Sequence, residues 1–276
     1  MRNIAILGTG WLGLPLAEAF IENGFTVNGS TTTENRVNIL QEKGISAHQI
    51  ALQETGPEGD ISAFLKNTEI LIINIPPGLR RNPEVNFVSK IHNLIPHIES
   101  SNVKNVLFIS STSVFADVEG FPVTSNETLP NATSNAGKQL IETEHLLQKN
   151  THFSTTVLRF AGLFGPNRHP ATMLSKRKNI KNPKAPVNLI HLEDCIGVIK
   201  KIIETSCWNE VLNACYPDHP EKAKYYGQVC ESMGFPAPDY DFETPSKGKL
   251  IDSQYLMKKL KYTFKKQLMG LPKNNF

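Results

Sequence analysis

The first part of the chain alternates short apolar runs with segments of helical periodicity. Runs of strand length occur at residues 4–7, 25–28, 47–52, 69–75, 103–110 and 155–160, and the run at 47–52 is the weakest. Helical patterns occur at residues 12–23, 34–43, 86–99 and 138–148. Strands that alternate with helices are joined as parallel strands by right-handed crossovers. The pattern therefore predicts an α/β fold, a Rossmann-type doubly wound parallel sheet.

The pattern changes after about residue 163, where prolines become frequent and the apolar segments become shorter. A basic stretch at Lys176–Lys184 is followed by a strand-like segment at 187–191 and a helical pattern at 193–204. We expect residues 1–162 to form the sheet domain, and residues 163–276 to form a smaller region from which some segments return to the sheet. The basic stretch is either a solvated loop, its default interpretation, or a lid that recruits a phosphorylated substrate.

Composition and charge exclude several classes of protein. The chain has 276 residues and a formal net charge of +3, and its pI near 8.6 lies below the range of nucleic-acid-binding domains. No apolar run has the length of a membrane span, and the N-terminus carries no apolar signal segment. We therefore expect a cytoplasmic protein with no nucleic-acid or membrane partner.

The irregular spacing of the cysteines predicts reduced, mostly buried thiols. Their positions are Cys195, Cys207, Cys215 and Cys230.

A glycine motif lies between the first strand and the first helix. It reads Gly8-Thr9-Gly10-Trp11-Leu12-Gly13 and matches G-x-G-x-x-G in the context that this motif requires. Gly8 permits the tight turn, Gly10 lets backbone amides approach a pyrophosphate, and Gly13 allows the helix to pack against the strand. The helix N-terminus adds unpaired donors and a partial positive charge. The motif predicts a dinucleotide site within residues 1–162; the alternative is a glycine turn with no ligand.

The end of the second strand bears on which nicotinamide nucleotide binds. NAD sites usually carry an acidic residue there, but this segment reads Ser30-Thr31-Thr32-Thr33 and has no acid before Glu34. The hydroxyls of Ser30, Thr31 and Thr32, with Arg36, suit a 2′-phosphate, which a carboxylate would repel. NADP is therefore preferred over NAD, although Arg36 can equally be a solvated residue of the first helical turn.

Further cofactor contacts are expected where other parallel strands end. Asn74, Ile75 and Pro76 end the strand that passes under the riboses in this fold, and Ser110 ends the strand at 103–110. Arg80 and Arg81 follow shortly after and are candidates to hold an anionic substrate. The alternative for these two residues is a turn with exposed arginines.

Four segments resemble landmarks of the extended short-chain dehydrogenase/reductases, within the NAD(P)-dependent epimerase/dehydratase superfamily. They are the glycine motif, Ile109–Asp117, Leu158–Pro166 and Pro186–Asp194, in the family's order and spacing. Glu119–Pro130 is a weaker fifth landmark, similar to the acidic loop before the catalytic helix. The resemblance covers nearly the whole chain. It implies an oxidoreductase or epimerase that acts on a small hydroxylated substrate such as a nucleotide sugar, with residues 163–276 as the substrate region. It also implies a homodimer formed through two helices.

The sequence departs from that family at the catalytic helix, where the resemblance implies Y-x-x-x-K. Ungapped alignment places Ala136 at the Tyr and Leu140 at the Lys. Lys138 lies about 200° away from either position on a helix, and a shifted register that uses Lys138 places Ser134 at the Tyr. The chain therefore resembles an atypical subgroup that lacks the usual acid/base pair.

The remaining hydroxyls follow the strand at 103–110. Ser111 occupies the position of the family's catalytic Ser or Thr, Thr112 is adjacent, and Phe115 replaces the usual Tyr of V-Y-G. Ser111 and Thr112 are the catalytic candidates, with ordered water, because an unassisted serine is a poor general acid. The alternative is that residues 110–113 only satisfy loop backbone groups.

His191 precedes two acids, Glu193 and Asp194, which suggests a metal site. A structural histidine followed by acids that stabilise a helix N-terminus is the preferred interpretation, so no metal is expected.

Two hypotheses for function remain open. The first is an NAD(P)-dependent oxidoreductase or epimerase, and the second is a non-catalytic NADP-binding sensor or regulatory protein.

Overall fold

A seven-stranded sheet forms the centre of the fold in the computed structural model, which describes residues 2–79 and 82–268. The strand order is β12-β9-β7-β6-β1-β2-β3, and the neighbouring pairs from β7 to β3 are all parallel. This confirms the predicted Rossmann-type doubly wound sheet. The strands are β1 (Asn3–Leu7), β2 (Thr26–Thr31), β3 (Ser46–Gln49), β6 (Ile70–Ile73), β7 (Asn105–Ser111), β9 (Ser154–Phe160) and β12 (Val211–Ala214).

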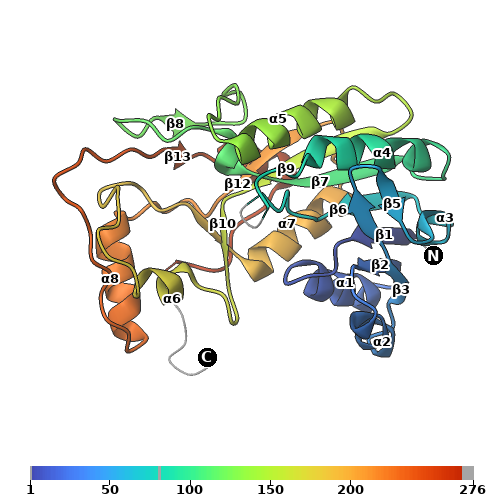
Figure 1. Cartoon of the computed structure of the whole chain (residues 1–276), viewed down its shortest axis with the longest axis horizontal. Coiled ribbons are helices and arrows are strands. Elements are labelled where there is room, and N and C mark those ends of the chain that lie inside the picture. The colour runs from blue at the N-terminus through green and yellow to red at the C-terminus, as the bar shows by residue number, and fades with distance from the viewer. Residues whose placement is uncertain (1, 80–81, 269–276) are drawn as a thin grey trace. The chain divides into compact units, whose positions relative to one another are not determined.

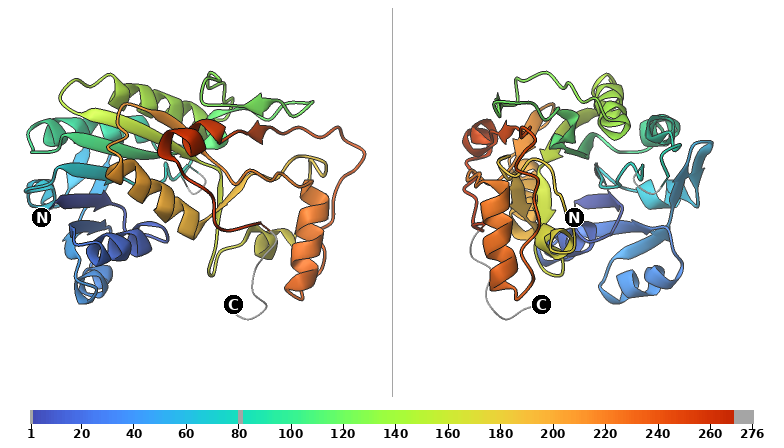
Figure 2. Two further views of the ribbon diagram at one scale, coloured as in Figure 1. Left: turned by 180° about the vertical axis from the view of Figure 1, so that it is seen from behind. Right: turned by 60° about the vertical axis from the view of Figure 1, so that its left-hand side comes forward.

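Helices cover both faces of this sheet, with α1 and α2 on one face and α4 and α5 on the other (Figures 1 and 2). The amphipathic spacing explains the packing, since α4 buries Phe87, Ile91 and Leu94 at intervals of three and four residues. No helix among the described residues has the length and apolar character needed to cross a bilayer. The helices are α1 (Gly13–Glu22), α2 (Asn35–Glu42), α3 (Ile61–Leu65), α4 (Phe87–Glu99), α5 (Asn135–Gln148) and α7 (Leu192–Glu204).

The order in which the chain adds strands changes side between β1 and β6. Strands β2 and β3 lie on one side of β1, and the later strands β6, β7, β9 and β12 lie on the other. Strand β1 pairs with β2 on one side and with β6 on the other. Ligands of open α/β sheets bind at such a switch point, outside the carboxyl ends of the strands. Leu7 of β1 lies beside Ile73 of β6, so Gly8 and Asn74 leave the sheet next to one another.

The chain divides into two compact units that interleave along the sequence. One contains most of the chain up to Val114, with Thr133–Leu158 and Ile202–Val211. The other contains Phe115–Ala132, Arg159–Lys201 and the described residues from Leu212 onward. The expected domain boundary near residue 162 stays a prediction. The two compact units are not separated at one position in the sequence, because segments from both sides of residue 162 belong to the second unit. One example is β8 at 123–124, which pairs with β13 at 250–251.

The second unit has a hydrophobic core of its own, centred on Phe164, Leu189, Tyr225 and Val229. Of the seven described elements of this unit outside the large sheet and α7, only β11 has a counterpart among the sequence expectations, because the apolar segments of the other six are short. The elements of the unit outside the large sheet are β8 (Val123–Thr124), β10 (Gly162–Phe164), α6 (Pro170–Leu174), β11 (Leu189–His191), α8 (Lys222–Ser232), β13 (Leu250–Ile251) and α9 (Gln254–Leu260). All four cysteines are buried and free of disulfides, as their spacing predicts.

Two predicted elements are wrong in detail. The expected strand at 47–52 is two strands, because β4 (Ala51–Gln53) leaves the sheet and forms an antiparallel hairpin with β5 (Gly56–Glu58). The helix expected from residue 138 begins at Asn135, because the Ser134 hydroxyl accepts a hydrogen bond from the Gly137 amide and caps the first turn.

Candidate functional site

The three glycines of residues 8–13 have different surroundings. Gly8 has φ +101°, and a Cβ there would lie 2.5 Å from the Asn74 carbonyl oxygen. A Cβ on Gly13 would lie 2.1 Å from the Gly8 carbonyl oxygen. A Cβ on Gly10, by contrast, would meet no protein atom within 4 Å. Two glycines are therefore required by close packing of the chain itself, whereas Gly10 faces open space in which a ligand fits.

Hydrogen bonds from β2 and from the end of β6 hold this loop in place. The Gly8 amide donates to Ser30 Oγ at 2.8 Å, and the Thr9 amide and hydroxyl both donate to the Ser30 carbonyl oxygen. On the other side, Asn74 Nδ2 donates to the Gly8 carbonyl oxygen at 2.9 Å. Because Ser30 and Asn74 are occupied with the loop, their first role is to preorganise its backbone.

Helix α1 begins without a side-chain cap. Leu12 stands at its N-cap position, and within the described residues this position makes no side-chain capping hydrogen bond. The intrahelical bonds start with the Leu14 amide, which donates to the Gly10 carbonyl oxygen at 3.0 Å. An uncapped helix N-terminus next to a glycine with open space above it is suited to bind phosphate.

A pocket of about 380 Å³ lies over the glycine loop and the ends of β2 and β6. Nine of the fourteen predicted cofactor residues line it: Gly8, Thr9, Gly10, Ser30, Thr31, Thr32, Arg36, Ile75 and Pro76. The other five, which are Trp11, Leu12, Gly13, Asn74 and Ser110, do not line it. The sequence reasoning missed several lining residues, namely Leu7, Thr33, Ile50, Leu52, Pro77, Phe87 and Lys90. Phe87 and Lys90 carry no motif, and only the packing of α4 brings them here.

The electrostatic character of the pocket is cationic. Arg36 and Lys90 are the charged residues among its described lining, and neither Asp nor Glu lines it. Arg36 is held by a hydrogen bond of 3.0 Å from Nη2 to the Thr9 carbonyl oxygen, so its guanidinium lies over the loop. Thr31 and Thr32 also line the pocket. Such a lining can bind a phosphorylated ribose through charge-assisted hydrogen bonds.

The hydroxyl cluster at the end of β7 does not lie in this pocket. Ser110 is buried and donates to Glu144 Oε1 of α5 at 2.5 Å, so it braces the sheet against the helix. Ser111 is half-buried, and its Oγ accepts a hydrogen bond from the Ser113 amide at 3.1 Å. Thr112 is buried in a short 3₁₀ helix.

Helix α5 carries the two positions at which the family resemblance implies Tyr and Lys. Ala136 is half-buried in its first turn, and Leu140 is only 4% exposed one turn later. Lys138 lies between them in sequence and is exposed to solvent. Neither aligned position therefore offers a group that can transfer a proton.

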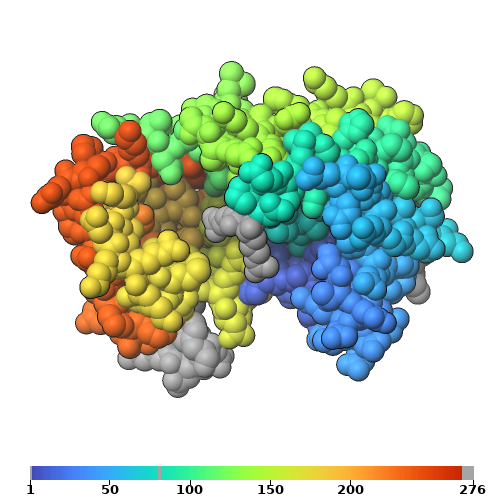
Figure 3. Space-filling view, in the orientation of Figure 1, coloured from blue at the N-terminus to red at the C-terminus, as the bar shows by residue number. Residues whose placement is uncertain are grey.

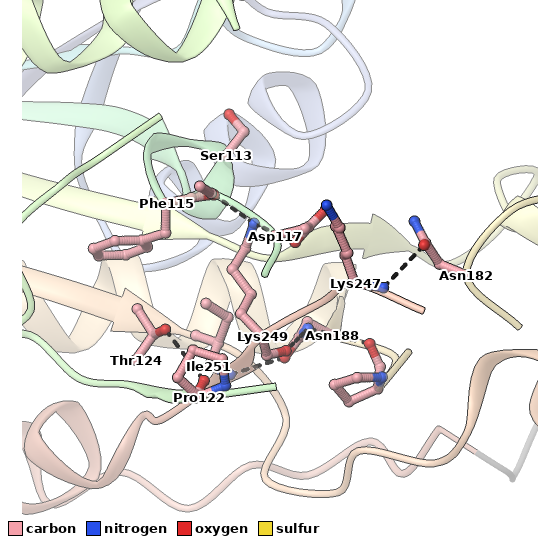
Figure 4. A network of polar contacts seen from close by, with 12 residues as sticks. Ser113, Phe115, Asp117, Pro122, Thr124, Asn182, Asn188, Lys247, Lys249 and Ile251 are labelled. Carbon is pink, nitrogen blue, oxygen red and sulfur yellow. Dashed lines mark hydrogen bonds and ion pairs between the residues drawn. The ribbon is translucent and has the colours of Figure 1, made fainter. Parts of the chain in front are cut away.

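In the second unit, a polar network joins two of the segments that carry the resemblance (Figure 4). Lys249 Nζ donates to the Phe115 carbonyl oxygen at 2.6 Å and to Asp117 Oδ1 at 2.8 Å. Asn188 Nδ2 donates to the Lys249 carbonyl oxygen, and Asn188 Oδ1 accepts from the Ile251 amide at 2.9 Å. Lys249 lies 132 residues from Asp117 in sequence, so no local pattern indicated it.

His191 and its neighbouring acids have structural partners. His191 Nδ1 accepts a hydrogen bond from the Glu193 amide at 3.2 Å, and burial lowers the pKa of this histidine. Asp194 does more than stabilise the helix N-terminus. Its buried carboxylate accepts hydrogen bonds from the Tyr262 hydroxyl and from the amides of Lys265 and Lys266, which attaches the C-terminal segment.

The basic stretch at 176–184 is attached to a later loop through aspartate carboxylates of that loop. Lys181 forms an ion pair with Asp241, and the Asn179 amide donates to Asp239 Oδ2 at 3.1 Å. The sequence interpretation considered only the stretch itself, which has no acids. Arg80 and Arg81, the candidate substrate residues, lie outside the described part of the chain.

The glycine loop, the switch point and the strand order define a Rossmann-type protein with a pocket at the carboxyl ends of its strands. The family profile described as the NAD dependent epimerase/dehydratase family matches residues 4–196, and the chain belongs to that family. The resemblance identified from sequence motifs is thereby confirmed.

Among curated relatives, protein YeeZ of Escherichia coli K12 is 32% identical over 267 residues, which is 96% of each chain. Solved structures share the fold at lower identity. The UDP-glucose 4-epimerase of Thermotoga maritima with UDP-glucose is 19% identical, with a TM-score of 0.79 over 97% of this chain and 95% of that one. A short-chain dehydrogenase/reductase superfamily protein of Agrobacterium tumefaciens with bound NAD is 14% identical, with a TM-score of 0.77 over 97% and 94%.

Proposed function

We propose that this protein binds NADP in preference to NAD and acts as an oxidoreductase or epimerase on a small hydroxylated substrate. The observation that carries the proposal is the pocket over the glycine loop, which presents hydroxyls and Arg36 where NAD sites present a carboxylate. Membership of the NAD dependent epimerase/dehydratase family supports the reaction class.

The residues present fit a dinucleotide. The space above Gly10 and the uncapped N-terminus of α1 suit a pyrophosphate. Thr31, Thr32 and Arg36 suit the 2′-phosphate, and the backbone at Ile75 and Pro76 lines the wall beside the riboses. When bound, the nucleotide supplies a hydride acceptor or donor; this chain supplies the binding and the orientation.

Proton transfer in this proposal relies on hydroxyls and water. Ser111 and Thr112 are the candidates to hold a substrate oxygen, since Ala136 and Leu140 provide no phenol and no ammonium. Serine and threonine are weak acids at neutral pH, so a proton-transfer step that depends on them is slow. We therefore expect low turnover and a flat pH profile through the range where a Tyr–Lys pair would titrate.

The choice of NADP differs from the nucleotide seen in a solved neighbour. The Agrobacterium protein carries NAD, but at 14% identity its nucleotide preference does not transfer to this chain. The absence of a carboxylate among the described lining residues is the better guide here, because a carboxylate beside a 2′-phosphate would repel it.

A nucleotide sugar is the substrate class that we favour. The Thermotoga epimerase was solved with UDP-glucose, and its fold covers nearly all of this chain. The homodimer that the family resemblance implies is also part of the proposal, and sedimentation velocity measures it directly.

The decisive experiment is calorimetric titration of nucleotide-free protein with NADPH, NADP, NADH and NAD. We expect the two phosphorylated nucleotides to bind at least about tenfold more tightly, since Arg36 forms a charge-assisted contact with the additional phosphate. Arg36→Gln should remove most of that preference and leave NADH binding unchanged. Equal affinity for all four would overturn the NADP preference, and binding of none would overturn the whole proposal.

A second candidate function is supported by the residues of α5. A protein with Ala136 and Leu140 at these positions can bind the nucleotide and report its redox state without turnover. Such a sensor binds oxidised and reduced nucleotide with different affinity, and it shows no hydride transfer in a screen of nucleotide sugars. An enzyme shows turnover with at least one substrate, so the same titration followed by a substrate screen separates the two.

A further inference from the structure

The first turns of α4 present different residues to the two cavities beside them. Phe87 and Lys90, three positions apart, both line the pocket over the glycine loop. Val88, Ser89 and His92 line a separate groove of about 570 Å³. The helical register therefore directs Lys90 into the nucleotide pocket and away from the groove.

The side chain of Lys90 lacks a partner among the residues that the structure describes. Within residues 2–79 and 82–268, its ammonium forms no hydrogen bond and no ion pair, although the residue is half-buried. The same pocket is also lined by the apolar residues Ile50, Leu52 and Pro77. A half-buried ammonium without a counter-ion is stabilised when an anion binds beside it. An unpaired cation that lines a pocket is therefore a candidate ligand contact.

The two cations of the pocket come from different elements. Arg36 lies in the first turn of α2, whereas Lys90 lies on α4. Helix α4 lies beside the β4–β5 hairpin, where the surfaces of the two segments meet (Figure 3). The pyrophosphate already has a partner in the uncapped N-terminus of α1. A phosphate monoester on the ribose carries about −1.5 to −2 charges at neutral pH, so Arg36 alone neutralises only part of it.

We propose that Lys90 is the second cation of the 2′-phosphate site and that, with Arg36, it determines the preference for NADP over NAD. This inference rests on the proposed nucleotide-binding function. It assigns the preference of that site for NADP in part to α4, which belongs neither to the glycine motif nor to the segment that follows β2. The anion that Lys90 recognises is the ribose phosphate monoester, and the pyrophosphate is left to α1.

The test compares ligands that differ only in the relevant phosphate. NADP, NAD, 2′,5′-ADP and 5′-AMP are titrated by calorimetry into the wild type and into Lys90→Gln. Loss of one charge-assisted contact should weaken NADP and 2′,5′-ADP about tenfold and change NAD and 5′-AMP less than about twofold. Lys90→Arg, which keeps the charge, should retain most of the preference. Lys224→Gln, an exposed lysine of α8, is the control for general charge effects and should change nothing.

The outcomes separate this inference from the function on which it rests. A wild type that binds none of the ligands removes the nucleotide-binding proposal and this inference together. A wild type that prefers NADP, with a Lys90→Gln variant that keeps the full preference, overturns only the role of Lys90. Equal weakening of NADP and NAD in Lys90→Gln assigns Lys90 to the pyrophosphate and overturns the specificity role.

Discussion

Helices α1 and α5 both lead into a strand of the large sheet, β2 and β9 respectively, but their first turns differ in how they are capped. Helix α1 has Leu12 at its N-cap and no side-chain cap among the described residues, so the protein leaves the start of this helix open to a ligand. In α5 the Ser134 hydroxyl accepts a hydrogen bond from the Gly137 amide at 3.2 Å. An N-terminus that the protein caps for itself stabilises the fold, whereas an uncapped one can bind an anion.

The same contrast extends to the inner faces of the two helices. The loop before α1 leaves open space at Gly10, while α5 fills its buried face with Leu140 and Leu147. Within one compact unit, the loop before α1 therefore leaves space for a ligand, whereas the buried face of α5 is filled by the protein's own side chains. We therefore expect nucleotide binding to depend on α1 and its loop and not on α5, and four substitutions test this comparison.

Gly13→Ala should have the largest effect, a loss of about 3 kcal/mol in the free energy of unfolding, because the added Cβ overlaps the Gly8 carbonyl. Urea denaturation measures it. Gly10→Ala is the matched control and should cost less than about 0.5 kcal/mol, since its Cβ meets no protein atom. A Gly13→Ala variant as stable as the wild type would contradict the close packing of α1 on the loop.

Gly10→Glu should weaken nucleotide binding about 100-fold, or roughly 2.7 kcal/mol, because a carboxylate enters the space that suits the pyrophosphate. Calorimetric titration with NADPH measures the loss, and circular dichroism checks that the fold is retained. Unchanged affinity would show that α1 does not bind the phosphates.

Leu140→Lys should destabilise the fold by about 2 kcal/mol at neutral pH, because an ammonium replaces a buried apolar side chain. Burial lowers the pKa of such a lysine below its unfolded value, so the unfolded state binds more protons and the deficit shrinks as the pH rises. Denaturation at pH 7 and pH 10 measures both effects, and Leu140→Met controls for packing. A lysine tolerated without cost at pH 7 would show that α5 still has room for the ammonium that the family resemblance implies.

Ser134→Ala should have the smallest effect, a loss of about 1 kcal/mol in stability with nucleotide affinity unchanged. Ser134→Asp should restore the loss, because Asp is also an effective N-cap. Thermal unfolding and NADPH titration together measure this pair. A change in affinity in Ser134→Ala would show that the two helix ends are coupled, contrary to the comparison above.

Much of the fold was predictable because strong local signals agree with the tertiary structure. The buried strand at 4–7, the glycine motif and the helix after it follow from apolar pattern and turn chemistry alone. The strand at 47–52 was not resolved into two, since hydrophobic pattern does not show that Ala51 to Gln53 pair with β5. The helix start at Asn135 was missed, although Ser134 is a recognisable N-cap residue.

For the candidate site, the sequence indicated the residues that lie in consecutive motifs and missed those that packing brings in. Arg36 follows the second strand closely and was identified. Lys90 and Phe87 lie on a helix far from any motif, and Lys249 lies far along the chain from the residues that it contacts. Ser110 was assigned to the cofactor from its place at a strand end, and its 2.5 Å hydrogen bond to Glu144 depends on how α5 packs.

The sequence by itself determined the doubly wound sheet, the glycine loop and the absence of Tyr and Lys at positions 136 and 140, because each depends on residues adjacent in the chain or on helical spacing. Only the tertiary structure decided which side chains share the pocket with Arg36, and why Gly10 but not Gly13 faces open space. The physical reason is that local backbone preferences act over a few residues, whereas a pocket is the remaining volume after distant elements have packed.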